Sequence, residues 1–315
     1  MRTEPVPLTV ERVAPSDVRR GLGRLLAPAG EPAAESSRVR AFERYLRGGS
    51  FDWEFWRAKR GDRDAALLLA MRLGGRTGVV MIPHPAPELD PAAQVELLSA
   101  WRRRYPADAF YYTQALIEPE ATAQQEILAS AGYRRLTRLE YLERDARYPW
   151  VDRPEADGLS WVSYAEAGDA LFAPTIAATY RDSRDCPELS TLRPIEAAIA
   201  GHKSAGAHDP RLWEAALIGD APAGVLLLAS VGASDALEVV YMGVVPEFRR
   251  RGVGGLLLRR ALEHARRERN RRLTLVVDAR NDPARRLYRA FGFMMFAARD
   301  AYIRVDAASG RQSSS

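Results

Sequence analysis

The segment 244–255 reads VVPEFRRRGVGG and is the part of the chain that decides the fold. An apolar run, 238–245, leads into it, and 254–269 follows with leucine and alanine at helical spacing. Glycine at positions 252 and 254 permits positive φ angles and lets a ligand approach the backbone. The amides of such a turn, with the open N-terminus of the next helix, form an array of donors for a pyrophosphate. The segment predicts a strand, a phosphate-binding turn and a helix laid on a sheet.

A second motif stands downstream, where 281–293 reads NDPARRLYRAFGF. Together the patterns V-x-P-x-x-R-R-x-G-x-G-x and N-x-x-A-x-x-L-Y-x-x-x-G-F resemble the two signature motifs of the GNAT acetyltransferase superfamily. The resemblance is strong over 158–305 and implies an N-acetyltransferase domain with acetyl-CoA as the acetyl donor. A P-loop is excluded because no lysine follows the glycines, and a dinucleotide site would need G-x-G-x-x-G early in a βαβ unit.

The resemblance also implies where the cofactor binds. It implies a mixed sheet splayed at the strand 238–245, where the pantetheine arm pairs like an added strand with the backbone of Met242, Gly243 and Val244. Asn281 is expected to hydrogen-bond the same arm. The expected pyrophosphate site consists of Arg249, Arg250, Arg251, Gly252, Val253, Gly254 and Gly255.

Acetyl transfer from a thioester to an amine needs a proton donor, an oxyanion donor and a base. Tyr288 is the predicted proton donor beside the cofactor, since a phenol with a pKa near ~10 is protonated at neutral pH and can protonate a thiolate. A backbone amide at Met242 or Gly243 would meet the oxyanion. Glu238 looks like the glutamate base that histone-acetylating GNAT enzymes carry on this strand, and alternation would put it on one face with Val240 and Met242. Each residue also has a plainer interpretation, Tyr288 as a core aromatic and Glu238 as an exposed acid at the strand's start.

The acceptor is expected against the loop 181–189, because in this family the segment between the first two helices covers the acceptor side. The three acids of the loop suit a cationic amine, and they equally suit a solvated loop paired with its own arginines. Cys186 is not expected to be a nucleophile, since GNAT transfer is direct and no histidine is close in sequence. His202 and His208 have no third ligand beside them, so no metal site is predicted.

The length of 315 residues predicts two domains. A polar stretch with two prolines, 144–158, contains the predicted linker, 146–157. We therefore expect a degenerate GNAT-like domain at 1–145, a catalytic GNAT domain at 158–306 and a disordered tail at 307–315. Expected strands are 66–72, 77–82, 110–117, 159–164, 213–218, 225–230, 238–245, 273–278, 293–297 and 301–305. Expected helices are 91–104, 121–131, 168–180, 194–202, 254–269 and 283–291.

The two halves share an internal repeat, because 127–133 parallels 287–293 at a constant offset of 160 and an apolar strand follows both segments. We infer a tandem duplication, and hence an α/β fold with mixed sheets in two copies of the GNAT acyl-CoA N-acyltransferase fold. The architecture is similar to that of mycothiol synthase-like tandem GNAT proteins, although their first copy, unlike this one, looks like a cofactor-binding domain. The acceptor is therefore left open.

The first copy lacks the residues of a cofactor site. Where the phosphate turn should follow, 83–87 reads PHPAP, and proline has no N–H to donate. Ala121 and Leu128 stand where the second copy has Asn281 and Tyr288. The first half is expected to keep the fold and to have lost the cofactor.

Composition narrows the class of protein. The formal net charge of +5 comes almost wholly from arginine, which suits an anionic ligand or simply an arginine-rich composition. No apolar run reaches the ~18 residues of a membrane helix, and a single cysteine agrees with a reducing cytoplasm, where the protein is expected. The arginine pairs have no aromatic platform, so no nucleic-acid partner is predicted. The leading hypothesis is an N-acetyltransferase acting on a primary amine of a small molecule or protein, and the alternative is a non-catalytic acyl-CoA-binding sensor or scaffold.

Overall fold

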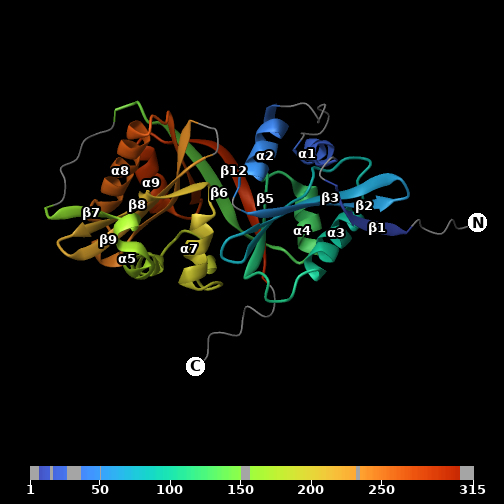
Figure 1. The fold of residues 1–315 in the computed structure, drawn as a ribbon, viewed down its shortest axis with the longest axis horizontal. Coiled ribbons are helices and arrows are strands. Elements are labelled where there is room, and N and C mark those ends of the chain that lie inside the picture. Colours follow the sequence, from blue (N-terminus) through green and yellow to red (C-terminus); the bar gives the residue numbers. More distant parts are fainter. Residues whose placement is uncertain are drawn as a thin grey trace, which may run out of the picture. The chain divides into compact units, whose positions relative to one another are not determined.

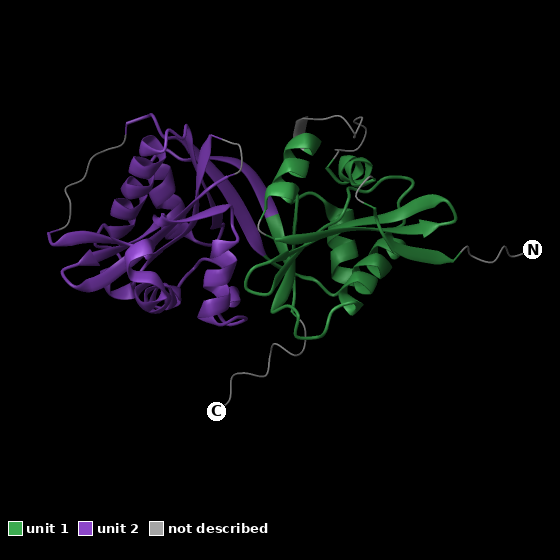
Figure 2. Ribbon diagram, in the orientation of Figure 1, with its two compact units in different colours: residues 1–136, 300–315 green, residues 137–299 purple. Residues whose placement is uncertain are grey.

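A computed structural model describes residues 7–14, 17–26, 37–49, 51–149, 157–231 and 235–305 (Figure 1). The chain forms two compact units, residues 1–136 with 300–315 (unit 1) and residues 137–299 (unit 2) (Figure 2). The predicted linker is described only at its ends, and the predicted tail, 307–315, lies outside the described residues.

Unit 1 is built on a mixed sheet. Its first four strands are antiparallel neighbours: β1 (Leu8–Arg12), β2 (Asp52–Arg60), β3 (Arg63–Leu73) and β4 (Thr77–Met81). Strand β5 (Tyr112–Ile117) then runs parallel to β4. The helices are α1 (Val18–Leu26), α2 (Ser37–Gly48), α3 (Pro91–Arg103) and α4 (Thr122–Ser130).

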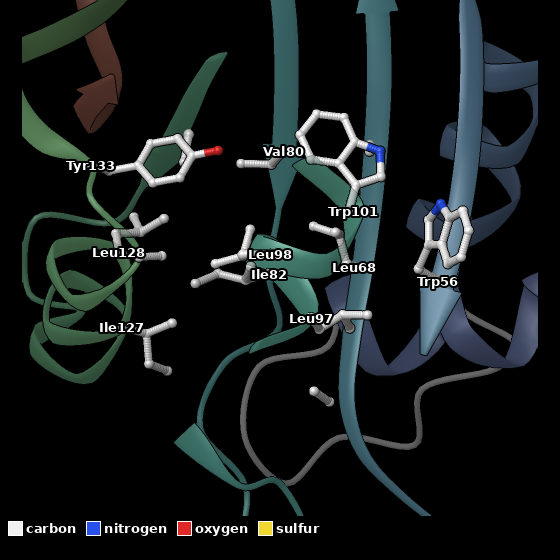
Figure 3. Close-up of a cluster of buried hydrophobic side chains, with 14 of the residues drawn as sticks. Trp56, Leu68, Val80, Ile82, Leu97, Leu98, Trp101, Ile127, Leu128 and Tyr133 are labelled. Atoms are coloured by element: carbon white, nitrogen blue, oxygen red, sulfur yellow. The ribbon is translucent and has the colours of Figure 1, made fainter. Parts of the chain in front are cut away.

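Two apolar cores cover the two faces of this sheet. Phe55, Leu67 and Leu69 pack with α1 and α2. Their neighbours in sequence, Trp56 and Leu68, pack with α3 and α4 in the cluster of Figure 3. This alternation is what a strand buried on both faces requires.

Unit 2 repeats the same order of elements. Its antiparallel strands are β7 (Leu159–Ser163), β8 (Ala207–Ile218), β9 (Ala221–Ser230) and β10 (Ala236–Val244), and β11 (Arg272–Asp278) is parallel to β10. The helices α5 (Tyr164–Tyr180), α6 (Pro187–Ser190) and α7 (Ile195–Lys203) precede β8. The helices α8 (Val253–Arg267) and α9 (Asp282–Ala290) follow β10 and β11, and the short 3₁₀ helix η1 (Pro246–Phe248) opens the turn before α8.

The last strand of each half of the sequence pairs with a strand from the other half. Strand β6 (Arg134–Asp145) ends the first half, but its residues 139–145 pair with 272–278 of β11. Strand β12 (Met294–Arg304) ends the second half, and its residues 300–304 pair with 113–117 of β5. The compact units therefore differ from the expected domains 1–145 and 158–306. Strand β12 is also continuous, so the prediction of two strands at 293–297 and 301–305 is wrong.

The expected internal repeat is confirmed by the matching connectivity and by the junctions after α4 and α9. Gly132 and Gly292 both have positive φ angles, 83° and 79°. In the first junction the Tyr133 amide donates to the Leu128 carbonyl at 2.9 Å, and in the second the Phe293 amide donates to Tyr288 at 3.0 Å. The offset of 160 residues thus relates two helix ends with the same hydrogen bonding.

Helix α8 is fastened to the sheet by a buried ionic cluster. Glu214 on β8, 6% exposed, accepts two hydrogen bonds from Arg260, at 2.6 and 2.7 Å, and contacts His264 Nε2 at 2.8 Å. Burial opposes ionisation of this carboxyl, yet the bonds from Arg260 and His264 outweigh it and lower the pKa of Glu214 to about 2.

We expect Glu214→Gln to lower the free energy of unfolding at pH 7 by about 3 kcal/mol, because it removes the buried anion that pairs with the partly buried Arg260 guanidinium. The folded pKa lies below the unfolded value near ~4.3, so the ionic stabilisation is complete above that pH and lost as pH falls toward 2. Denaturant unfolding of parent and variant should therefore converge in acid. Glu263→Gln removes a half-exposed partner of Arg260 and is the control. A difference between the free energies of unfolding of parent and variant that stays constant from pH 7 to pH 3 would contradict this account.

Candidate active site

Strand β10 separates from β11 partway along its length. Parallel pairing joins only 236–239 to 272–275, although β11 continues to Asp278. In the part of the chain that the structure describes, the edge of β10 beyond Val239 that faces β11 has no strand partner. Unpaired strand amides and carbonyls are what an extended ligand needs in order to pair as an extra strand.

A β-bulge lies where the strands separate, and it changes which side chains share a face. The register of β10 against β9 shifts between Val239 and Tyr241. Val240 and Tyr241 both pack on the side of α5 and α7, whereas Met242 packs on the side of α8. The prediction that Met242 shares a face with Glu238 is therefore wrong, because the extra residue of the bulge reverses the alternation.

Gly243 lies where α5 packs closely against β10. A Cβ atom there would stand 2.7 Å from the Thr179 side chain and 2.7 Å from the Tyr241 hydroxyl. These two groups are themselves hydrogen-bonded, with 2.7 Å between their oxygens. Close packing of the helix on the strand requires glycine here, a reason that the motif alone did not supply.

The glycine turn begins α8 as expected. Gly252 is the N-cap with φ 86°, and its carbonyl accepts from the amides of Gly255 and Leu256 at 2.9 and 3.2 Å. A Cβ on Gly254 would meet the tip of Leu287 at 3.2 Å and the Val244 side chain at 3.9 Å, and one on Gly255 would contact the Phe291 ring at 3.7 Å. The first turn of α8 thus combines an exposed helix N-terminus with close packing against α9.

The three arginines of this turn have different environments. The Arg249 guanidinium donates to the main-chain carbonyls of Thr179, Arg181, Asp182 and Val244, at 2.6 to 3.2 Å. Its donors are directed at the protein, so we assign Arg249 to the framework and not, as expected, to the pyrophosphate. Arg250 and Arg251 are exposed, and Arg251 lies over the Phe248 ring. Arg250 and Arg251 remain the predicted cationic residues of the pyrophosphate site.

Asn281 caps α9. Its side-chain oxygen accepts from the Ala284 amide at 3.3 Å, directly after β11 ends at Asp278. The residue therefore lies at the end of the strand that parts from β10.

Tyr288 lies on α9 and is 7% exposed, in the core shared with α8. Burial and the nearby Asp185 carboxylate raise the pKa of Tyr288, so its phenol stays protonated at neutral pH. Within the described chain no group hydrogen-bonds to its hydroxyl. A protonated hydroxyl without a partner is suited to donate to a ligand.

Glu238 faces the opposite side of the sheet from Tyr288, because its neighbours Leu237 and Val239 pack toward α8 and α9. It is half-buried, and burial raises its pKa. The structure therefore does not bring the two predicted catalytic side chains into contact. Glu238 lies next in sequence to Val239, where β10 parts from β11, and Tyr288 on α9 packs on the other face of the sheet.

The loop 181–189 is fixed to the end of β11. Asp278 is fully buried, and its amide donates to Asp185 at 3.0 Å while its carboxylate accepts from the Cys186 amide at 3.1 Å. Arg280 joins Asp278 to Glu188, with bonds of 2.7 Å to each. One interpretation expected the acids of this loop to pair with the loop's own arginines. The structure shows no such pairs in this described loop. Burial also raises the pKa of Cys186, in agreement with an unreactive thiol.

Sequence reasoning missed a group of aromatic side chains between α5, α7 and β10. The Tyr241 ring stacks on His202 with centroids 5.1 Å apart, and Tyr180 meets Tyr241 edge to face at 5.5 Å. Burial lowers the pKa of His202 to about 3, so this histidine is neutral at physiological pH. The only sequence signal was a tyrosine within an apolar strand.

No cluster of metal-binding side chains occurs among the described residues.

A cavity of about 930 Å³ in unit 2 lies at the other ends of these strands, against Glu143, Arg272 and Phe291. None of the predicted site residues lines it. The site is therefore built from the parting of β10 and β11 and not from this pocket.

The fold has counterparts among solved structures. A GCN5-related N-acetyltransferase from Sphaerobacter thermophilus superposes with a TM-score of 0.62 at 19% identity, covering 95% of both chains. A tandem GNAT protein from the clavulanic acid biosynthesis pathway gives 0.55 at 16% identity, covering 95% of this chain and 99% of that one. At such identities the likeness concerns the fold, which is that of a tandem GNAT protein.

Sequence comparison finds a family match in the second half of the chain. Residues 176–293 match the model of the Acetyltransferase (GNAT) family. A stretch of 65 residues is 42% identical to a mycothiol acetyltransferase from Corynebacterium diphtheriae, covering 21% of this chain and 22% of that protein. The chain thus aligns with about a fifth of that relative's length. Among the described helices, none has the length and apolarity to cross a membrane.

Proposed function

We propose that the protein is an N-acetyltransferase that moves an acetyl group from acetyl-CoA directly to a primary amine of a small molecule or protein. The observation that carries this proposal is the separation of β10 from β11 next to the glycine turn that begins α8. The GNAT family match over 176–293 supports it.

The residues around this separation fit the cofactor. Backbone groups of Met242, Gly243 and Val244 would pair with the pantetheine arm, and the amide nitrogen of Asn281 would bond it, since the side-chain oxygen caps α9. The backbone of 250–255, with the Arg250 and Arg251 side chains, would hold the pyrophosphate. When bound, acetyl-CoA supplies an activated acetyl group as a thioester.

The protein's own groups would manage the protons. Glu238 takes the proton of the acceptor ammonium, directly or through a water, because burial raises its pKa toward the range of a useful base. An amide of Met242 or Gly243 stabilises the oxyanion. Tyr288 gives its proton to the departing thiolate from the other face of the strand. The side chains of Tyr288 and Glu238 argue for an enzyme over the alternative, a non-catalytic acyl-CoA sensor or scaffold.

The acceptor test separates these alternatives. Purified protein with acetyl-CoA is assayed against a library of primary amines by thiol release, alongside a calorimetric titration of acetyl-CoA. Transfer to an amine supports the enzyme, while tight binding without any transfer favours the sensor.

The single cysteine, which leaves no intrachain disulfide to form, fits our proposal of a cytoplasmic site of action.

The first copy should not bind the cofactor, because a side chain occupies its equivalent of the ligand-pairing edge. Gln124 on α4 is 3% exposed and donates to the carbonyls of Ile82 and Pro83, just after β4, at 3.0 Å each. The residue 160 positions on is Ala284, whose side chain is too short to do this. The prolines of 83–87 remove amides from the same place.

We therefore expect a calorimetric titration to give one equivalent of acetyl-CoA per chain. Gln124→Ala should leave that stoichiometry unchanged, since the prolines would still prevent phosphate binding. Two equivalents bound to the parent would contradict the assignment of the first copy as inactive.

A further inference from the structure

Strand β6 brings an aromatic side chain beside the point where β10 parts from β11. Residues 272–275 of β11 still pair with β10, so Val276 is the first residue of β11 beyond that pairing. Val276 pairs in turn with Tyr141 of β6. Neighbouring strands lie ~5 Å apart, so Tyr141 is two strand spacings, ~10 Å, from a ligand that lies in the parting.

These side chains share the face of the sheet that is turned away from α8. Their neighbours in sequence pack in the core with α8, namely Leu275, Val277 and Leu142. Alternation therefore directs Val276 and Tyr141 to the opposite face, which is also the face of Glu238. Glu238 pairs with β11 two residues before Val276, so the predicted base and Tyr141 lie on the two sides of β11.

Phe296 of β12 extends the apolar part of this face. Its ring meets the Tyr141 ring edge to face, with centroids 6.2 Å apart and an angle of 69° between the planes. The Phe296 side chain is 55% exposed, and Tyr141 and Val276 are half-buried. Contiguous apolar side chains that stay open to solvent beside a site indicate a binding surface.

The polar end of this face is a carboxylate without a partner. In the described structure Glu238 forms no hydrogen bond or ion pair with another side chain. A second acid, Glu143 on β6, is paired with Arg272 at 3.2 Å. Burial raises the pKa of the Tyr141 phenol, and the Glu238 charge raises it further against the opposing effect of Arg299, in agreement with the strand register.

We propose that Tyr141 and Phe296 bind the apolar body of the acceptor, and that the acceptors are primary amines joined to an aromatic ring by a chain of several carbon atoms. The ammonium lies at Glu238 beside the parting, and the chain crosses Val276 to reach the two rings. The ~10 Å between the parting and Tyr141 sets the length of the acceptor. This inference rests on the proposed acetyltransferase function. Tyr141 and Phe296 take no part in proton transfer, so their loss affects KM and not kcat.

The test compares parent, Phe296→Ala and Met295→Ala with two acceptors, 4-phenylbutylamine and n-butylamine, which share the amine and the chain and differ in the ring. The parent should have a kcat/KM at least tenfold higher for 4-phenylbutylamine. Phe296→Ala should raise the KM of that amine about tenfold, or about 1.4 kcal/mol, with little change in kcat and no effect on n-butylamine. Met295, 58% exposed, is directed by alternation to the other face of β12, and its variant should match the parent.

A second measurement does not need turnover. Protein saturated with coenzyme A is titrated calorimetrically with 4-phenylbutylamine, and Phe296→Ala should weaken this binding by the same factor. Tyr141→Leu keeps an apolar side chain at a half-buried position and removes the ring, so it should weaken the binding as well. Unfolding curves would show that the variants are folded.

The outcomes separate this inference from the function on which it rests. Unchanged KM and unchanged amine affinity in Phe296→Ala and Tyr141→Leu would overturn the role of the two rings. Equal kcat/KM for the two amines, or no transfer to either while acetyl-CoA still binds, would overturn the acceptor class. Absence of acetyl-CoA binding would instead refute the proposed function itself.

Discussion

Tyr288→Phe should reduce kcat by ~10²-fold or more while leaving the affinity for acetyl-CoA almost unchanged. The substitution keeps the ring, which packs in the core of α8 and α9 with its centroid 5.9 Å from that of Phe293. It removes only a hydroxyl that forms no hydrogen bond with a described residue, so the fold should lose little stability. Turnover falls because the thiolate must then leave without a proton from the protein.

The control for this variant is Tyr302→Phe, which deletes the hydroxyl of another buried tyrosine, in unit 1. Its kcat should equal that of the parent. Steady-state kinetics and calorimetry on both variants separate catalysis from binding. If Tyr288→Phe lost cofactor affinity and turnover together, the residue would be structural.

Gly254→Glu should weaken acetyl-CoA binding at least tenfold, or by about 1.4 kcal/mol. The substitution puts a negative charge at the first turn of α8, where the helix N-terminus and the neighbouring arginines favour an anion. Steric cost is small, since a Cβ here meets only side-chain tips, that of Leu287 at 3.2 Å and that of Val244 at 3.9 Å.

Gly254→Ala is the matched variant, because it adds the methyl group without the charge. Its affinity should stay close to that of the parent in the same calorimetric titration. Unfolding curves would show that both variants are folded. Equal affinities for parent and glutamate variant would mean that the pyrophosphate binds elsewhere.

The elements around the site were predicted from sequence to within a few residues because local signals define them. Helix α8 has a glycine start and helical periodicity, and it begins at Val253 and ends at Arg267, against the expected 254–269. Strand β11 is Arg272–Asp278, against 273–278. These limits follow from turn chemistry and from burial of one face, which a sequence displays directly.

The first part of unit 1 was not predicted at all. Strand β2 reads DWEFWRAKR, and its neighbouring residues Phe55 and Trp56 are both buried, so the alternation of a half-exposed strand is absent. Helices α1 and α2 are short and rich in arginine. Their apolar faces become recognisable only against the core that they cover.

Other features of the site depend on distant residues, which no local pattern reveals. The bulge in β10 adds one residue without any change of composition, so alternation gave Met242 the wrong face. Arg249 looked like a phosphate ligand because the carbonyls that it binds at Thr179, Arg181 and Asp182 are far away in sequence. The contact between Asp185 and Asp278 spans a similar gap.

The exchange of β6 and β12 ties the maturation of both units to the progress of translation. When a ribosome has made residues 1–136, the sheet of unit 1 still lacks the partner of β5, which is residues 300–304. The nascent first half therefore has one unpaired strand edge until residues 300–304 are made. Unpaired strand edges are prone to pair with other chains. Cutting the gene at 146–157 would likewise yield two fragments that each carry the other's missing strand, so the sequence repeat does not mark independent folding units.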